Sequence, residues 1–212
     1  MKNAKHFYKI IRRAWRKLGH KKRRTLSLVM IGSIILALMI QETKPLIEPT
    51  AYTPLLTTIA KGESNGNYNA YFGRAGNAEI RFTDMTVADV MHWQQEYVKQ
   101  GKASNAVGRY QFMGTTLAGL VKQLRINPQA KFNEALQDRL AIALMERRGS
   151  HAFVQKKISR EQFAANLAME WAALPRIIGG NPTQSYYAGD GLNKARISTG
   201  EVLAAIDKLK TK

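Results

Sequence analysis

One glutamate stands among residues that would suit acid catalysis on a sugar. Glu63 closes an apolar stretch that is typical of a helix end, and the small and amide side chains after it include Ser64, Asn65 and Asn69. Breaking a glycosidic bond requires a carboxylic acid that is protonated near neutral pH and held among groups that hydrogen-bond the sugar. Glu63 is therefore the candidate acid. The alternative from these residues alone is a solvated helix end followed by a turn.

Two later clusters offer groups that hold sugars. In residues 106–112, Gly108 lets the backbone come close to a ligand, and Tyr110 and Gln111 then supply a ring and an amide. Sugars present apolar faces and fixed hydroxyls, so an aromatic ring beside amides suits them. Trp171, in residues 166–175, is either a core residue or a wall of the same cleft. Each cluster alone is also consistent with side chains that only pack and cap.

Other chemistries lack their usual residues. The chain has no cysteine, its four histidines share no metal-ligand spacing, and neither a Ser/His/Asp order nor a phosphate loop is present. We therefore expect no metal, no cofactor and no serine nucleophile.

The clusters and several shorter motifs follow one another in a fixed order over roughly residues 53–178. They are Gly62-Glu63-Ser64, Asn67-Tyr68-Asn69-Ala70, Phe82-Thr83-Asp84, Gly108-Arg109-Tyr110-Gln111, Phe132 with Gln137-Asp138, Glu146-Arg147-Arg148-Gly149 and Glu170-Trp171-Ala172-Ala173-Leu174-Pro175. This order resembles the lambda-type phage endolysins and related phage muramidases, lysozyme-superfamily enzymes that act as lytic transglycosylases on peptidoglycan. By position, Glu63 matches the catalytic acid, and Tyr110 and Gln111 match the cleft segment. Asp84 and Trp171 match further motif positions.

The resemblance implies cleavage between N-acetylmuramic acid and N-acetylglucosamine. Glu63 would protonate the bridging oxygen and then take a proton from the muramic C6 hydroxyl, which closes a 1,6-anhydro ring. A hydrolytic lysozyme usually needs a second carboxylate. The phage-T4 type has an Asp nine residues after its Glu, where this chain has Phe72. Glu79 and Asp84 stay candidate second carboxylates, so a hydrolase on the same bond is the first alternative and a non-catalytic peptidoglycan-binding protein the second.

Positive charge is concentrated at the start of the chain. Of the formal net charge of +18, residues 1–24 supply eleven Lys and Arg side chains and no acidic one. Phe7, Ile11, Trp15 and Leu18 recur there at helical spacing, which predicts a basic amphipathic segment at an anionic, cytoplasmic membrane surface. A membrane-tethered nucleic-acid binder is the alternative. Because most of the charge lies in this segment, we expect no specific nucleic-acid partner.

The next segment has the composition of a membrane anchor. Thr25–Ile40 is sixteen residues without a charge, roughly 24 Å as a helix. A cleaved signal peptide and a core helix are the alternatives; a single transmembrane helix over residues 25–41, in contact with the lipid bilayer, fits best. The positive-inside rule then places the N-terminus in the cytoplasm and the catalytic domain in the periplasm or outside the cell. The alternative is that the anchor lies in the membrane of a membrane-containing virion. The prolines within residues 42–52 predict a linker there.

Residues 53–212 predict a lysozyme-like muralytic domain made almost entirely of helices. The expected helices are 53–62, 86–100, 115–124, 133–148, 159–174 and 198–209, and a short strand is expected over Glu79–Phe82. The predicted fold class is α+β, mostly α: a two-lobed helical domain with a small β-hairpin or glycine-rich insert, preceded by the transmembrane helix. The expected partners are peptidoglycan glycan strands, together with virion or other phage proteins.

Overall fold

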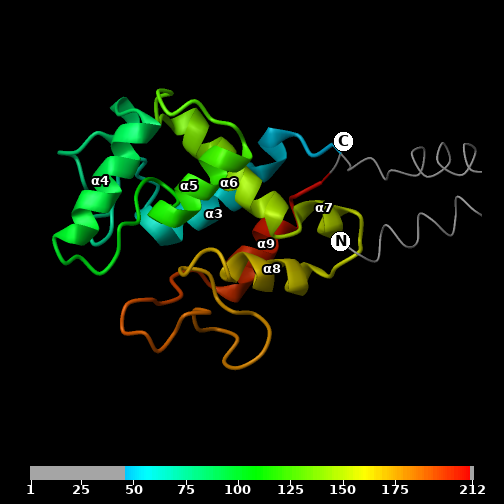
Figure 1. The fold of residues 1–212 in the computed structure, drawn as a ribbon. Helices are drawn as coiled ribbons and strands as arrows, with labels where there is room; N and C mark the ends of the chain where they lie inside the picture. The colour runs from blue at the N-terminus through cyan, green and yellow to red at the C-terminus, as the bar shows by residue number, and fades with distance from the viewer. Residues whose placement is uncertain (1–45, 211–212) are drawn as a thin grey trace, which may run out of the picture. The chain divides into compact units, whose positions relative to one another are not determined.

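Helices form the framework of residues 46–210, the part of the chain that the computed structural model describes (Figure 1). These residues belong to one compact unit. In chain order the elements of this part are the 3-10 helix η1 (Pro49–Tyr52), α3 (Thr53–Ser64), the 3-10 helix η2 (Phe82–Asp84), α4 (Val87–Lys99), α5 (Gly114–Gln123), α6 (Glu134–Arg147), α7 (Ser150–Val154), α8 (Arg160–Ala168) and α9 (Thr199–Ile206).

Helix α3 packs against three other helices of the described residues. It contacts η1, α6 and α9; α8 packs on α9, α7 packs on both α6 and α8, and α4 pairs with α5 (Figure 1). Leu55, Leu56 and Ile59 recur at helical spacing on α3, and all three are buried. Burying one such side chain contributes roughly 1.5–3 kcal/mol. Tight packing along α3 therefore fixes the position of its C-terminal end, where Glu63 lies.

Side-chain caps begin four of the helices where the sequence predicts. The Thr86 hydroxyl accepts a hydrogen bond from the Asp89 N–H, and the Asp89 carboxylate accepts one from the Thr86 N–H, so a capping box begins α4. A second capping box, of Ser198 with Glu201, begins α9, and at α6 and α8 the Asn133 and Ser159 side chains each accept from one first-turn N–H. Such a cap contributes about 1 kcal/mol.

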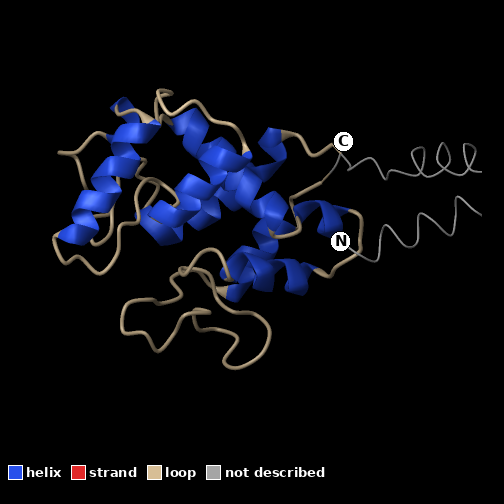
Figure 2. Cartoon of the chain, viewed as in Figure 1, coloured by secondary structure: helices blue, strands red, loops and turns tan. Residues whose placement is uncertain are grey.

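The sequence-based prediction of β-structure is wrong for the described residues. The described residues contain isolated β-bridges but no strand, and Figure 2 shows only helices and loops there, so the α+β class with a β-hairpin is wrong for this part of the chain. The reason lies in Asn77. Its side-chain oxygen accepts from the Glu79 and Ile80 N–H groups, and its NH₂ donates to the Asn69 and Ile80 carbonyls. One amide thus satisfies backbone groups that a strand would have paired.

The helix predicted over residues 159–174 ends early, at Ala168. The Met169 carbonyl, which a continuing helix would have used for the Ala173 N–H, accepts instead from the Tyr187 hydroxyl at 2.8 Å and from Arg148 at 3.0 Å. The chain turns, and the Ala173 N–H points elsewhere. A short helix that the sequence did not predict, α7, follows the left-handed Gly149.

The predicted membrane anchor is also corrected. Within residues 46–210 no helix combines the length and the apolar character needed to cross a bilayer. The predicted single-pass membrane protein, and the localisation derived from it, therefore find no support in this part of the chain and are withdrawn. Residues 1–24 and 25–41, on which those predictions rested, lie outside the described residues, as does most of the linker predicted over 42–52.

Candidate active site

The last turn of α3 presents Glu63. The helix ends at Ser64, and Asn65 takes the left-handed conformation that closes it, with a φ of 53° and its N–H on the Ala60 carbonyl. Gly62 precedes Glu63 because no side chain fits there. A Cβ at this position would lie 2.8 Å from both Ala173 Cβ and Ile197 Cγ1. The absence of a side chain lets two later segments close against the end of α3.

Those two segments determine the surroundings of the Glu63 carboxyl group. The Ala173 N–H, set free by the early end of α8, donates to Glu63 Oε1 at 2.9 Å. The Arg196 and Ile197 N–H groups both donate to the Ala173 carbonyl, and the Arg196 guanidinium donates to the Gly62 carbonyl at 3.2 Å. The segment that hydrogen-bonds Glu63 is thus itself anchored to residues 196–197, and Arg196 also bonds to the residue before Glu63.

Burial makes Glu63 a weak acid. It raises the pKa of Glu63 from 4.5 to about 7, and the hydrogen bond from Ala173 and the positive charge of Arg196 oppose this only in part. The residue is nevertheless not sealed off, because it lines an open cleft. A carboxyl group with these properties is protonated for much of the time near neutral pH and accessible to a ligand, as a general acid must be.

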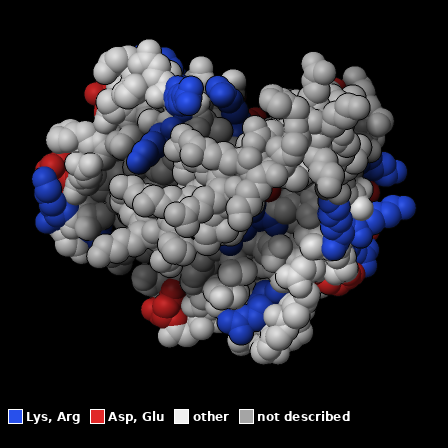
Figure 3. All heavy atoms as spheres, turned by 45° about the vertical axis from the view of Figure 1, so that its right-hand side comes forward, with Lys and Arg blue, Asp and Glu red and all other residues white. Residues whose placement is uncertain are grey.

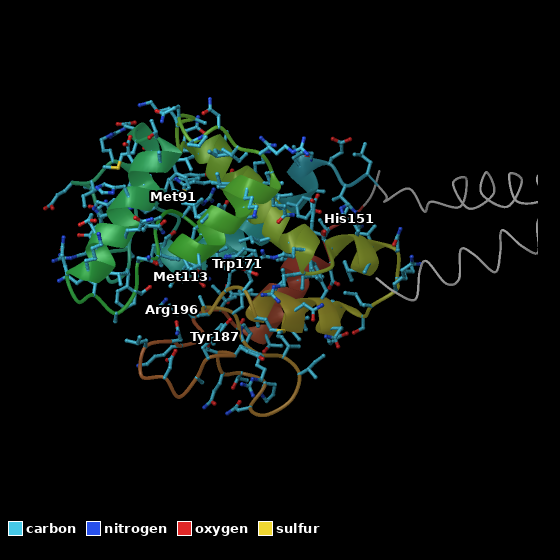
Figure 4. All side chains as sticks on the ribbon, viewed as in Figure 1. Met91, Met113, His151, Trp171, Tyr187 and Arg196 are labelled. Carbon is cyan, nitrogen blue, oxygen red and sulfur yellow. The ribbon has the colours of Figure 1, made fainter. Side chains whose placement is uncertain are left out.

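The cleft has a volume of about 750 Å³, a typical size for a ligand site. Its walls come from the end of α3, residues 71–75, residues 103–113, and the segments around Trp171 and Arg196. Figure 4 shows Met113, Trp171, Arg196 and Tyr187 gathered between α3, α5 and the loop of residues 176–195. The cleft is therefore built from several parts of the chain that only the fold brings together.

Five of the predicted site residues line this cleft: Glu63, Ser64, Asn65, Gln111 and Trp171. Ser64 is almost fully buried, and its hydroxyl donates to the Arg109 carbonyl at 2.8 Å. The Trp171 indole N–H donates to the Tyr110 carbonyl at 3.2 Å. Gln111 has a φ of 48°, and its side-chain NH₂ donates to the Gly108 carbonyl. These bonds tie the Gly-Arg-Tyr-Gln segment to the end of α3 and to the Trp171 segment.

Two other predicted residues lie behind the cleft wall. The Asn69 side-chain oxygen accepts from the Thr83 N–H at 2.9 Å, which joins the loop after α3 to η2. Tyr110 is 1% exposed, and its hydroxyl donates to Asp138 at 2.6 Å. Burial raises the pKa of Tyr110 above its ordinary value, and the hydrogen bond to Asp138 adds to this. Both side chains stabilise the loops that carry the cleft residues.

The two candidate second carboxylates lie outside the cleft. Asp84 is exposed and pairs with Arg81 at 2.6 Å, and the Glu79 side chain is exposed. The cleft does contain another carboxylate that the sequence did not single out, Glu170. It accepts from Arg147 at 3.0 Å and from Arg148 at 2.8 Å.

Sequence reasoning also missed Arg74, Tyr187 and Arg196 as cleft residues. Residues 176–195 carry no regular spacing and give no helix or strand pattern. A paired aromatic, Tyr186-Tyr187, and an arginine just before a helix cap were the available signals. No group of three or more potential metal-binding side chains occurs among the residues that the structure describes.

Comparisons with known proteins give one match. A family model described as Endolysin matches residues 53–200, more than half of the chain, and this span includes every residue of the cleft. No curated protein and no solved structure matches the chain.

Proposed function

This chain belongs to the endolysin family of phage peptidoglycan-degrading enzymes, and we propose that it is a lytic transglycosylase in which Glu63 supplies both the acid and the base. The observation that carries the proposal is the carboxyl group of Glu63, which burial keeps about half protonated near neutral pH while it stays open to a cleft of about 750 Å³.

The proposed reaction balances with one carboxyl group. Glu63 donates its proton to the oxygen that joins the muramic C1 carbon to N-acetylglucosamine, and that C1–O bond breaks. The muramic C6 hydroxyl oxygen bonds to C1 and closes the 1,6-anhydro ring, and its proton passes to the Glu63 carboxylate. The acid is thereby restored without water. A pKa of about 7 suits both roles, because the two protonation states then have similar free energies near neutral pH.

The other carboxylate of the cleft is poorly placed to activate water or attack the sugar. Glu170 accepts hydrogen bonds from two guanidinium groups, and only 8% of its side chain is exposed. Its lone pairs are therefore engaged and its charge is balanced. A hydrolase needs a carboxylate free for one of those tasks. This arrangement favours the transglycosylase over the hydrolase.

Substrate contacts in this proposal come from the residues that face the cleft. The Asn65 and Gln111 side chains offer amide groups for sugar hydroxyls, and the exposed Tyr187 offers its ring. Trp171, which is 2% exposed, forms part of the cleft wall. Ser64, Asn69 and Tyr110 act indirectly in this proposal, because their polar atoms bond to the backbone or to Asp138.

The test is Glu63→Gln in the full chain, assayed for clearing of purified peptidoglycan. The substitution keeps an oxygen for the Ala173 N–H but removes the proton, so we expect loss of clearing by at least about 10³-fold with an unchanged circular dichroism spectrum. Glu79→Gln, at an exposed glutamate outside the cleft, is the matched control and should clear normally. Full clearing by Glu63→Gln would overturn the assignment.

A further inference from the structure

Two arginines of the cleft form no ion pair with an acidic side chain of the described residues. Arg74 and Arg196 line different parts of the cleft wall, one from the loop after α3 and one from the segment before α9. In residues 46–210 neither guanidinium forms an ion pair with an Asp or Glu side chain at 4 Å or less. The Arg196 guanidinium does donate to the Gly62 carbonyl, and its charge lowers the pKa of Glu63. A guanidinium group that lines a ligand cleft without an ion-paired carboxylate can still bind a carboxylate of the ligand.

The backbone holds Arg74 in place while leaving its side chain free. Gly73 has a φ of 75°, and the Arg74 N–H donates to the Tyr71 carbonyl at 2.8 Å, which makes a tight turn. The Phe72 N–H donates to the Ala106 carbonyl at 2.9 Å and anchors this turn to the opposite loop. The Arg74 side chain itself makes no hydrogen bond within the described residues and is exposed. Arg74 thus lines the cleft with a guanidinium group that is free to contact a ligand.

The remaining charges of the cleft do not cancel these two. Glu170 is paired with Arg147 and Arg148, so that cluster has a surplus of positive charge. Burial keeps Glu63 largely uncharged below neutral pH. Figure 3 shows several separate groups of Lys and Arg side chains on one face of the molecule and fewer Asp and Glu. The free charge of the cleft is positive.

The sugar rings of peptidoglycan carry only hydroxyl and acetamido groups, which need no cation. Its carboxylates belong to the lactyl substituent of muramic acid, either as the free acid or, when a peptide is attached, further along that peptide. We propose that Arg74 and Arg196 bind this carboxylate substituent, so that the enzyme recognises muramic acid by charge as well as by shape. The inference rests on the proposed function, because it names the substrate group that the same cleft selects.

The test measures binding by the full chain carrying Glu63→Gln, so that no ligand is cleaved. The probes are isolated glycan strands with their stem peptides, strands stripped by an amidase, and both kinds with their carboxylates converted to methylamides. Adding Arg74→Gln should weaken binding of at least one carboxylate-bearing strand about fivefold and leave the methylamide strands within about twofold. Lys122→Gln, which removes an exposed charge on α5 outside the cleft, is the control and should change neither.

The pattern of loss identifies the source of the carboxylate. Weakening limited to the peptide-bearing strands assigns a stem carboxylate, and weakening limited to the stripped strands assigns the lactyl carboxylate. Arg196→Gln provides a second reading of the same pattern. Unchanged affinity for both charged strands, or equal losses on charged and methylamide strands, would overturn the proposal. If the proposed function is wrong but the binding proposal is right, the wild-type chain will bind the charged strands more tightly than the methylamide strands and will release no fragments from them.

Discussion

Replacing Glu63 with glutamine should stabilise the fold at alkaline pH while abolishing catalysis. In the folded chain burial raises the pKa of Glu63 from 4.5 to about 7. Between these two values the unfolded chain releases its proton and the folded chain keeps it. The stabilisation that the neutral carboxyl group provides is therefore complete below pH 4.5 and is lost as the pH rises to about 7. Glutamine stays neutral at every pH, so the Glu63→Gln variant does not lose this stabilisation.

The magnitude follows from the displacement of the pKa. Each pKa unit corresponds to about 1.4 kcal/mol, so full burial would give a difference of about 3 kcal/mol above pH 8. Because Glu63 also faces the open cleft, water screens part of its charge, and we expect about 2 kcal/mol. The glutamine of the variant keeps an acceptor for the Ala173 N–H, which limits other losses.

The assay is urea unfolding of the full wild-type chain and of Glu63→Gln at intervals from pH 4 to pH 8.5. The difference in unfolding free energy should be constant near pH 4, rise in favour of the variant between pH 4.5 and 7, and then level off. Glu79→Gln is the control, since the Glu79 side chain is exposed to water in the folded chain as in the unfolded one. A difference for Glu63→Gln that does not change with pH would refute the assigned burial of this carboxyl group.

Three further substitutions test the surroundings of Glu63. Gly62→Ala places a Cβ 2.8 Å from two neighbouring side-chain carbons, so thermal unfolding should show a loss of about 1–3 kcal/mol and activity should fall. Arg196→Gln removes a charge that lowers the pKa of Glu63, so the alkaline limb of the pH–rate profile should move to higher pH, and Arg196→Lys should restore it. Asn69→Ala leaves the Thr83 N–H without its acceptor and should cost about 1 kcal/mol of stability. Because the Asn69 side chain supports the cleft and does not touch the sugar in this proposal, kcat/KM should fall more than the affinity for peptidoglycan.

Local patterns in the sequence predicted most of the helices. The spacing of Leu55, Leu56 and Ile59 fixes α3, and caps such as Thr86 with Asp89 fix helix starts, because both depend on residues a few positions apart. Glu63 could be singled out for the same reason, since it closes a helix and small polar residues follow it.

What escaped prediction depends on contacts between distant residues. The early end of α8 requires the Tyr187 hydroxyl on the Met169 carbonyl. The loss of the strand is the exception, because the Asn77 amide accepts from N–H groups only two and three residues later. Glu170 could not be recognised as a neutralised cleft carboxylate because its two arginines lie more than twenty residues earlier. The cleft itself is therefore a property of the fold, and the sequence alone identified only part of its lining.

The most direct test of a single-carboxyl mechanism is the fate of water in the reaction. Peptidoglycan is digested by the full chain in water enriched in heavy oxygen, and the released muropeptides are weighed by mass spectrometry. If Glu63 works alone, the muramic ends will be 1,6-anhydro products one water lighter than reducing ends, and they will carry no heavy oxygen. Reducing ends labelled with heavy oxygen would show that water attacks the sugar, and would contradict the account.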